Sequence, residues 1–481
     1  MRRAGGLRAT LLAMLLAVLP CTWLHAAVAT VASDRWLPLE RQWFDDVGMA
    51  EGLPHSITTA LAQDRDGLMW IGTMGGLARY DGYRVQVFEL ADAAAAGLPD
   101  TYVRSLLALP DGGLLVGTNA GGLARFDPQT GHFRSYPVGP GGTGNRKIYA
   151  LAADGDSGVW IATDNGLDRL DLHSDRIAPV DTGPAAPRNF AVYQDRTGNL
   201  WLGNDKGLFV RYAGRHDFVR PDHSAGVVDQ VLHDEIWAVR EDAEGRLWVG
   251  SVQMGAIYRD TDGRWCTVPG FSGYDGTARQ ATVRDFLEVR PGRMWIATDG
   301  DGIVTYSPGD ADTRVLDHDT SLPSSLPGNS VRALLLGRAG NAWAATDLGA
   351  ARSNARADIA FSMLPSSDSA HSLANPNVRS ILVDARGRIW LGMAAGEIDI
   401  VDPVAGTVRH LKLAGKQLRR DVQSLAEAPD GSIWVGTQGL AQVDPDTLAV
   451  RDAILPALGD SPVLSLLRMG PYMLIGTYNG A

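Results

Sequence analysis

One short pattern occurs ten times along the chain, and this repetition constrains the fold more than any other feature. In its clearest copy, residues 64–80 read DRDGLMWIGTMGGLARY, so two turns rich in Asp and Gly alternate with two apolar stretches. Asp and Gly tolerate the left-handed backbone angles of tight hairpins, and Trp and Ile are typical of buried strands. Because a single hairpin cannot bury its own faces, it becomes stable only when copies stack on one another.

The copies align on the Trp of this segment. Their spacing is 40 to 48 residues, the period expected of four-stranded propeller blades. Two residues after the aligned position stands only Gly or Ala, so a larger side chain does not fit there, and the next position is mostly Thr. The aligned positions are Trp70, Leu115, Trp160, Trp201, Trp248, Trp295, Trp343, Trp390, Trp434 and Leu474.

A second column, ten residues before the first nine aligned positions, holds Ala or Ser with Asp285 as the exception. Small residues suit innermost strands that crowd around a central axis. The sequence therefore predicts an all-β protein: a seven-bladed β-propeller of four-stranded blades at 35–365, followed by the first blades of a second, incomplete propeller at 366–481. The segment Leu39–Asp45 precedes the first copy, and we expect it to close the seventh blade as an outer strand. A plain N-terminal extension is the alternative.

Residues 1–29 have the features of a secretory signal peptide. Three Arg precede an apolar stretch at 9–19, and an Ala-rich stretch follows at 26–29. The apolar stretch is short for a membrane span, which favours cleavage and a periplasmic location. The formal net charge of −11 argues against a nucleic-acid partner. Cys266 is the one cysteine outside this leader, so we expect no intramolecular disulfide.

Residues 52–82 resemble the repeat of two-component regulator propellers. They contain Gly-Leu-Pro and then Gln-Asp-x-Asp-Gly-x-x-Trp-Ile-Gly-Thr-x-Gly-Gly-Leu-x-Arg-Tyr-Asp-Gly. The resemblance covers residues 40–481. Members of that family usually carry two seven-bladed propellers in the periplasm, followed by a β-sandwich, a transmembrane helix and a cytoplasmic kinase or diguanylate cyclase. The resemblance implies the periplasmic sensing region of a receptor anchored in the inner membrane and able to form a homodimer, with the output enzyme outside this chain.

No catalytic constellation stands out in the sequence. It has no His-Glu-x-x-His motif, no Gly-x-Ser-x-Gly elbow and no Gly-rich loop with the Lys of a phosphate site. Asp64-x-Asp66-Gly67 lacks the later acidic ligands of a calcium loop. We therefore predict no catalytic residue, no metal site and no cofactor.

Two further sets of polar and aromatic residues are expected on one face of the first ring. One set follows the second strand of each blade and the other begins the first strand, and loops at these ends share a face where propellers commonly bind ligands. Aromatic, amide, carboxylate and Arg side chains together suit a small polar ligand, in particular a carbohydrate. Packing between blades is the alternative role. The candidate ligand-binding residues are Asn119, Asp164, Asp205, Asp299, Arg104, Tyr149 and Trp237.

Three functions fit these observations. The first is a periplasmic sensing domain of a transmembrane receptor, without catalysis of its own. The second is an exported propeller enzyme, such as a lyase or glycosidase acting on polysaccharide. The third is a scaffold that binds another protein at its rim. The missing catalytic constellation favours the first.

Overall fold

The structure is a computed structural model that describes residues 39, 42–88, 90, 97–183, 188–222, 226–271, 282–310, 313–320, 322–353, 363–366, 369–414, 420–452, 461–478 and 480. The chain divides into two compact units, one of residues Gln42–Ala357 and one of Met1–Arg41 with Asp358–Ala481. The predicted signal peptide at 1–29 lies outside the described residues. Much of the segment 354–368 also lies outside them, so the domain boundary predicted between 365 and 366 stays a prediction.

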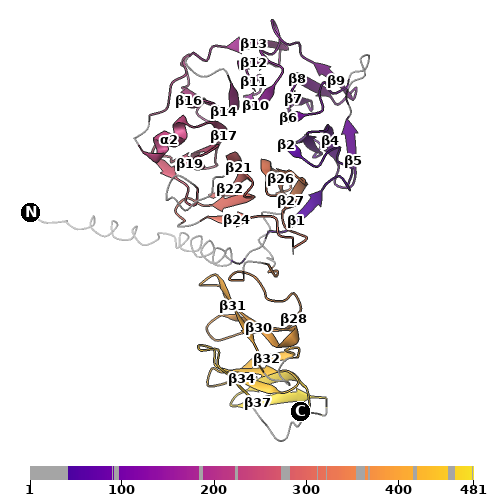
Figure 1. Ribbon diagram of the computed structural model, residues 1–481, viewed down its shortest axis with the longest axis vertical. Helices are drawn as coiled ribbons and strands as arrows, with labels where there is room; N and C mark the ends of the chain where they lie inside the picture. The colour runs from indigo at the N-terminus through magenta and orange to yellow at the C-terminus, as the bar shows by residue number, and fades with distance from the viewer. Residues whose placement is uncertain are drawn as a thin grey trace, which may run out of the picture. The chain divides into compact units, whose positions relative to one another are not determined.

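The larger unit is a ring of seven antiparallel sheets, each a blade of a β-propeller (Figure 1). The first strand of each blade lies toward the centre of the ring. These innermost strands are β2 (Thr58–Gln63), β6 (Val103–Ala108), β10 (Ile148–Asp154), β14 (Asn189–Gln194), β17 (Ile236–Glu241), β21 (Thr282–Arg290) and β25 (Val331–Leu336).

The second strands carry the aligned Trp or Leu of the sequence repeat and are almost wholly buried. They are β3 (Met69–Thr73), β7 (Leu114–Thr118), β11 (Gly158–Thr163), β15 (Leu200–Asn204), β18 (Leu247–Ser251), β22 (Arg293–Asp299) and β26 (Ala342–Thr346). The third strands are β4 (Leu77–Tyr80), β8 (Leu123–Asp127), β12 (Gly166–Asp171), β16 (Gly207–Arg211), β19 (Ala256–Arg259), β23 (Ile303–Tyr306) and β27 (Gly349–Ser353).

Outer strands complete the blades, with one variation. The fourth blade is a three-stranded sheet in which Val210 of β16 makes only an isolated bridge to Val219, and the short helix α2 (Val227–His233) follows it. The outer strands of the other blades are β5 (Val85–Phe88), β9 (His132–Ser135), β13 (Arg176–Val180), β20 (Trp265–Thr267), β24 (Arg314–Leu316) and, for the seventh blade, β1 (Phe44–Val47).

The seventh blade is closed by the start of the ring, because β1 pairs antiparallel with β27 and places Phe44 opposite Ser353. The closing strand differs in position from the predicted segment Leu39–Asp45. Leu39 is instead buried in the core of the other unit, beside Leu391 and Val401. The chain therefore joins the blade only at Phe44, whose ring packs against Trp295 with centroids 6.0 Å apart.

The Gly column of the repeat marks where neighbouring blades touch. A Cβ added at Gly72 would lie 2.7 Å from Cγ1 of Val103, and one added at Gly117 would lie 2.7 Å from Cγ2 of Ile148. Val103 and Ile148 each begin the innermost strand of the next blade. Gly and Ala are thus retained because a β-branched side chain of the next blade fills the space above them.

The aligned Trp is joined to the turn before it. Nε1 of Trp248 donates a 2.9 Å hydrogen bond to Asp242, which also accepts the backbone N–H of Arg246. Burial would raise the pKa of Asp242, but the hydrogen bonds from Trp248 and Arg246 lower it below its usual value. The same pairing joins Trp70 to Asp64, Trp201 to Asp195 and Trp390 to Asp384.

The structure also explains the residue types in two other columns of the repeat. The Thr after the Gly column closes the hairpin that follows, as the hydroxyl of Thr73 does by donating to the carbonyl of Gly76 at 2.8 Å. Asp285, the exception among the small residues, bonds to the next blade by accepting the backbone N–H of Leu334 at 2.9 Å. Its larger side chain therefore links two blades instead of crowding them.

The smaller unit contains three sheets. The first consists of β28 (Val378–Val383), β29 (Ile389–Met393), β30 (Glu397–Asp402) and β31 (Thr407–Lys412), with the 3-10 turn η2 (Ala394–Gly396) between β29 and β30. The second consists of β32 (Ser424–Glu427), β33 (Ile433–Gly436), β34 (Leu440–Val443) and β35 (Val450–Asp452). The third consists of β36 (Val463–Met469) and β37 (Tyr472–Thr477). The outer sheets carry exposed apolar side chains, such as Ile381 and Leu467, which are 67% and 58% exposed. The fold is thus the predicted one: seven blades followed by the first blades of a second propeller.

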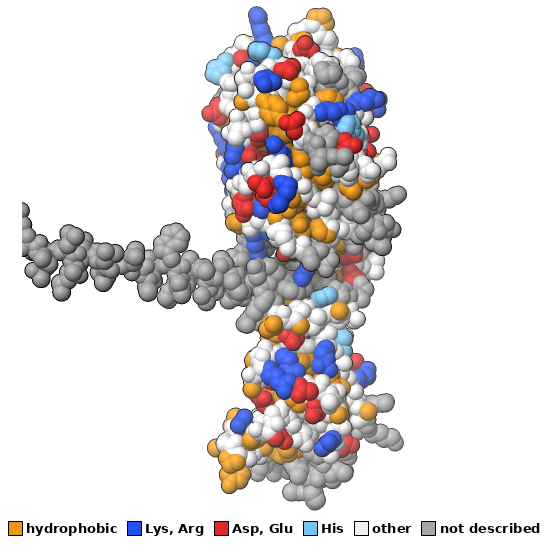
Figure 2. All heavy atoms as spheres, turned by 90° about the vertical axis from the view of Figure 1, so that its left-hand side faces the viewer, with side chains coloured by type: hydrophobic (Ala, Val, Ile, Leu, Met, Phe, Trp, Pro, Cys, Tyr) orange, Lys and Arg blue, Asp and Glu red, His pale blue; other side chains and the backbone are white. Residues whose placement is uncertain are grey.

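Among the described residues, no helix has both the length and the apolar character that a membrane crossing requires. On the side of the ring that lies to the left in Figure 1, basic and acidic side chains are interspersed (Figure 2).

Candidate functional site

The first ring has a β-bulge at the start of every innermost strand. In each blade the pairing of the first strand with the second skips one residue. Such an unpaired residue has its side chain re-aimed relative to the regular alternation of a strand. All seven skipped residues line one central cavity of about 620 Å³. They are, in blade order, Thr59, Arg104, Tyr149, Phe190, Trp237, Arg284 and Arg332.

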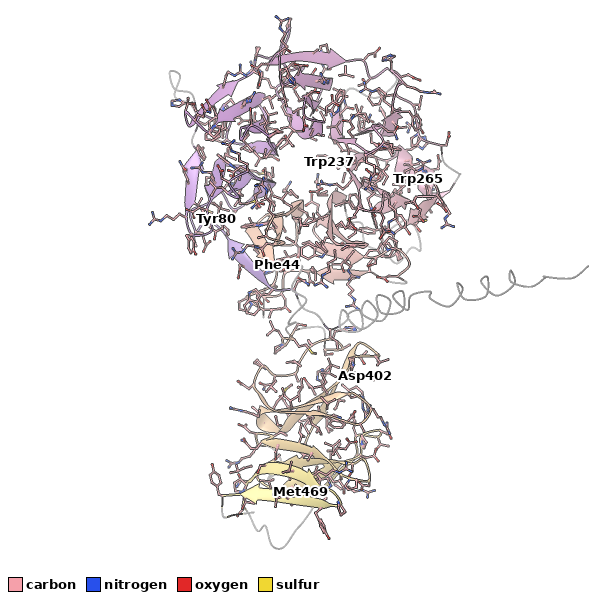
Figure 3. All side chains as sticks on the ribbon, turned by 180° about the vertical axis from the view of Figure 1, so that it is seen from behind. Phe44, Tyr80, Trp237, Trp265, Asp402 and Met469 are labelled. Atoms are coloured by element: carbon pink, nitrogen blue, oxygen red, sulfur yellow. The ribbon has the colours of Figure 1, made fainter. Side chains whose placement is uncertain are left out.

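The predicted candidates Arg104, Tyr149 and Trp237 therefore converge on the centre of the ring. Figure 3 shows Trp237 at the edge of the open centre, while Tyr80, Phe44 and Trp265 lie farther out. Four other residues of the same sequence column also line the cavity but were not among the candidates: Thr59, Phe190, Arg284 and Arg332. The sequence contained a signal for them, because the residue type varies along this column while the next residue in each repeat is mostly small.

The polar candidates that follow the second strands hold these side chains in place. Nε of Arg104 donates a 2.8 Å hydrogen bond to Oδ1 of Asn119. The hydroxyl of Tyr149 donates to Oδ1 of Asp164 at 3.1 Å, and the same oxygen lies 3.1 Å from Nε of Arg188. Burial and the Asp164 carboxylate raise the pKa of Tyr149 to about 12, so its hydroxyl is a hydrogen-bond donor at neutral pH.

The aromatic residues of three successive blades form one cluster. The rings of Phe190 and Trp237 are stacked, with centroids 4.6 Å apart and planes 7° apart. Tyr149 meets Phe190 edge-on at 4.9 Å. The guanidinium carbon of Arg284 lies 4.3 Å from the centroid of Trp237, and that of Arg104 lies 5.0 Å from Tyr149. Two Arg residues thus flank the aromatic cluster at its ends.

Asp299 connects the sixth blade to the seventh. Its Oδ2 pairs with Nη2 of Arg284 at 2.5 Å, and its Oδ1 accepts the hydroxyl of Ser330. Burial would raise the pKa of Asp299, but the hydrogen bonds from Ser330 and Arg284 lower it below its usual value. The carboxyl is therefore ionised at neutral pH and offsets part of the positive charge of this arc.

Two residues lack the partners that the others have. Asp205 is not among the cavity-lining residues, and its Oδ1 is buried without a hydrogen-bond partner in the described part of the chain. Arg332 lines the cavity, and its Nε is buried without a hydrogen-bond partner there. Within the described residues, no group of three or more His, Cys, Asp or Glu is arranged to hold a metal ion.

Three segments match the model of the two-component regulator propeller: residues 52–75, 230–253 and 372–395. The first two lie in the ring and the third in the smaller unit. The chain thus carries repeats of this type in both units. Among curated proteins, none has a sequence that matches the chain.

Solved structures show the same fold. The extracellular domain of the hybrid two-component system BT3049 from B. thetaiotaomicron matches with a TM-score of 0.70 at 17% identity, over 91% of this chain and 58% of that one. The extracellular domain of the one-component system BT4673 from the same organism matches with a TM-score of 0.56 at 18% identity, over 86% and 54%. The chain thus spans less than two thirds of either domain. A streptogramin B lyase matches with a TM-score of 0.51 at 14% identity, over 66% of this chain and 99% of the lyase.

Proposed function

We propose that this chain is the periplasmic ligand-sensing propeller region of a transmembrane signalling receptor and is not itself catalytic. The repeats are of the regulator-propeller type, and two structural relatives are extracellular domains of one- and two-component systems. The N-terminal sequence has the pattern of a signal peptide, which agrees with export. A homodimer through the receptor is part of this proposal.

The observation that carries the proposal is the convergence of seven bulged residues on one cavity. Bulges disrupt the sheet locally, and they commonly lie where a side chain is re-aimed toward a functional site. Here the disruption recurs in every blade at the same place, and it presents residues of different chemistry to one volume. A cavity of about 620 Å³ is the size of a small-molecule site. We propose that a small polar ligand, of the carbohydrate class, binds there.

A catalytic role has weaker support. The similarity to a streptogramin B lyase indicates that a ring of this kind can host an enzyme, which keeps an exported lyase or glycosidase as the alternative. However, Asp285, the carboxylate that lines the cavity, is paired with Arg240. Asp164 and Asp299, which hold lining residues in place, are paired with Arg188 and Arg284. A carboxylate that acts as a general base or nucleophile must be free to meet the substrate.

The test is ligand binding to the purified chain, measured by thermal shift and then by calorimetry against a panel of sugars. Trp237→Ala removes an aromatic residue that lines the cavity, and we expect it to weaken binding at least tenfold. Trp265→Ala is the matched control, because Trp265 lies on the outer strand β20 of the same ring. Equal binding by both variants would contradict the proposed site. Release of unsaturated or reducing sugar ends from polysaccharide would favour the enzyme instead.

A further inference from the structure

The charged side chains that line the central cavity are predominantly basic. They are Arg104, Arg240, Arg284, Arg332 and Asp285. Asp285 accepts a hydrogen bond from Arg240 at 3.4 Å, and Arg284 pairs with Asp299. Arg240 and Arg284 thus each have a carboxylate partner, whereas the other two Arg residues of the lining have none.

Arg104 and Arg332 are those two. Arg104 bonds only to the neutral amide of Asn119 and lies over the rings of Tyr102 and Tyr149. Arg332 has no hydrogen bond or ion pair within the described residues, and its Nε is buried. The positive charge of Arg332 helps to lower the pKa of the Asp299 carboxyl, but that carboxyl already binds Arg284 and Ser330. A half-buried guanidinium without a partner is costly, and an incoming anion would remove that cost.

The two residues flank one position of the ring. Arg332 is the second residue of β25 in the seventh blade and Arg104 the second residue of β6 in the second blade. Strand β2 of the first blade packs between these strands. The intervening bulged residue is Thr59, whose small side chain donates its hydroxyl proton to the carbonyl of Val103. The arc from the seventh blade to the second therefore combines two cations with a small residue between them.

The opposite arc offers little free aromatic surface. One face of Trp237 is stacked on Phe190, and Arg284 lies over the indole at 4.3 Å. Tyr149 is in contact with Phe190 and lies beneath Arg104. Because these faces already have partners, stacking on a neutral sugar ring is not the interaction that the cavity offers best. The cavity is better suited to a ligand that accepts hydrogen bonds from guanidinium groups.

We infer that the cavity binds a small anion, a carboxylate carried on a polar ring such as a sugar acid, with Arg332 and Arg104 as the residues that hold its charge. The inference rests on the proposed ligand-binding function and narrows its ligand class. A carboxylate matches the planar fork of Arg and can accept two parallel N–H bonds from it. The remaining ring hydroxyls would meet the aromatic arc at its edges.

The experiment compares acids with neutral molecules of the same shape. Glucuronate and galacturonate are titrated into the full chain by calorimetry, alongside glucuronamide and glucose. We expect the acids to bind at least tenfold more tightly than the neutral molecules, and added NaCl to weaken only the acids. Arg332→Gln should weaken acid binding at least tenfold, Arg332→Lys less, and Arg104→Gln by a similar factor. Far-ultraviolet circular dichroism and thermal melting establish that each variant is folded.

Arg379→Gln is the matched control. Arg379 is the skipped residue of the equivalent bulge in β28 of the smaller unit, where it pairs with Asp421 at 3.4 Å. It should leave acid binding unchanged. Neutral sugars that bind as well as acids and respond to Trp237→Ala but not to Arg332→Gln would overturn the anion inference and leave the proposed site intact. Binding that no cavity variant alters would overturn both. Failure of every acid to bind would overturn the inference alone, because the wider sugar panel tests the site independently.

Discussion

The hydroxyl of Thr58 donates a 2.9 Å hydrogen bond to the carbonyl of Thr346, which lies 288 residues later in the chain. The same hydroxyl lies 3.0 Å from the carbonyl of Gly349. At the other end of β2, Gln63 accepts the backbone N–H of Arg338 at 2.9 Å. The innermost strand of the first blade is thus bonded to the seventh blade, whose outer strand β1 comes from the start of the ring. A ring closed in this way holds the bulged residues in fixed positions around the cavity.

Closure by β1 gives a prediction about two adjacent aromatic residues. Phe44 is 4% exposed and packs against Trp295, whereas Trp43 is 53% exposed. Phe44→Ala should lower the free energy of unfolding by about 3–5 kcal/mol, because it opens a cavity where the ring closes. Trp43→Ala should change it by less than about 0.5 kcal/mol. Urea denaturation of both variants measures the difference, and equal effects would argue that β1 contributes little to closure.

The contact between blades at the Gly column predicts a rescue. Gly72→Ala places a methyl group 2.7 Å from Cγ1 of Val103, and a Val side chain has little freedom to move away. The variant should lose about 1–3 kcal/mol of stability through overpacking. Gly48→Ala is the control, because its added Cβ would approach Glu51 no closer than 3.4 Å.

The double variant Gly72→Ala/Val103→Ala tests the cause of that loss. Removing the Val103 methyl groups makes room for the new Cβ, so the two substitutions should cost less together than the sum of their separate effects. Additive costs in a double-mutant cycle, measured by denaturation, would mean that Gly72 is required for another reason.

The blade count could be read from the sequence because the packing that sets it also constrains residue types. Gly72 and its equivalents must be small where blades meet, and the aligned Trp fills the second strand of most blades. Both requirements recur with each blade and therefore leave a periodic signal. The column that begins with Thr59 was also visible, because its members vary while their neighbours stay small.

The start of the closing strand and the arrangement of the cavity residues depended on contacts between distant parts of the chain, which leave no local signal in the sequence. The strand at Phe44–Val47 was expected to start at Leu39, but the burial of Leu39 in the other unit is a long-range event. The bulges that turn Arg104 and Trp237 into the cavity depend on how two strands pair, which a single strand's sequence does not encode. Likewise, packing between blades was the alternative role given for Trp237, but the sequence did not identify Phe190 of the neighbouring blade as its partner.

A partly exposed His paired with a buried Asp in the smaller unit predicts a pH dependence. Nδ1 of His410 lies 2.6 Å from Oδ1 of Asp399, and Nε2 lies 2.6 Å from the carbonyl of Ser369. Burial would lower the pKa of His410, but its contacts with Asp399 and Ser369 raise it above its usual value. Burial also raises the pKa of Asp399. The folded state therefore binds protons more tightly than the unfolded chain, so stability falls as pH rises.

The pH range over which stability falls is set by the titration of His410. Its contribution is fully present below the usual His pKa of about 6.5 and is lost as the pH rises through the higher pKa of the folded state. Amide exchange in β30 and β31, corrected for the intrinsic effect of pH, should be slower at pH 6 than at pH 8. His410→Gln should remove this difference, while replacement of the exposed His132 in β9 should leave it. A difference that persists in His410→Gln would assign it to another group.

Asp299 gives the last prediction, a gain of binding. Its carboxyl has a lowered pKa and is ionised at neutral pH, where it offsets the charge of Arg284 and interacts with that of Arg332. Asp299→Asn keeps the shape of the side chain and removes the negative charge, so the cavity becomes more positive. If the ligand is an anion, the affinity for glucuronate should rise by about 5- to 30-fold, since loss of a partly screened charge interaction is worth about 1–2 kcal/mol. Asp421→Asn, which removes the carboxylate that pairs with Arg379 in the smaller unit, should have no effect on binding. Calorimetry at low and high salt separates the charge effect from a change of shape. A weaker affinity in Asp299→Asn would show that the carboxylate positions Arg284 for the ligand, and that the positive charge of the cavity does not by itself set the affinity.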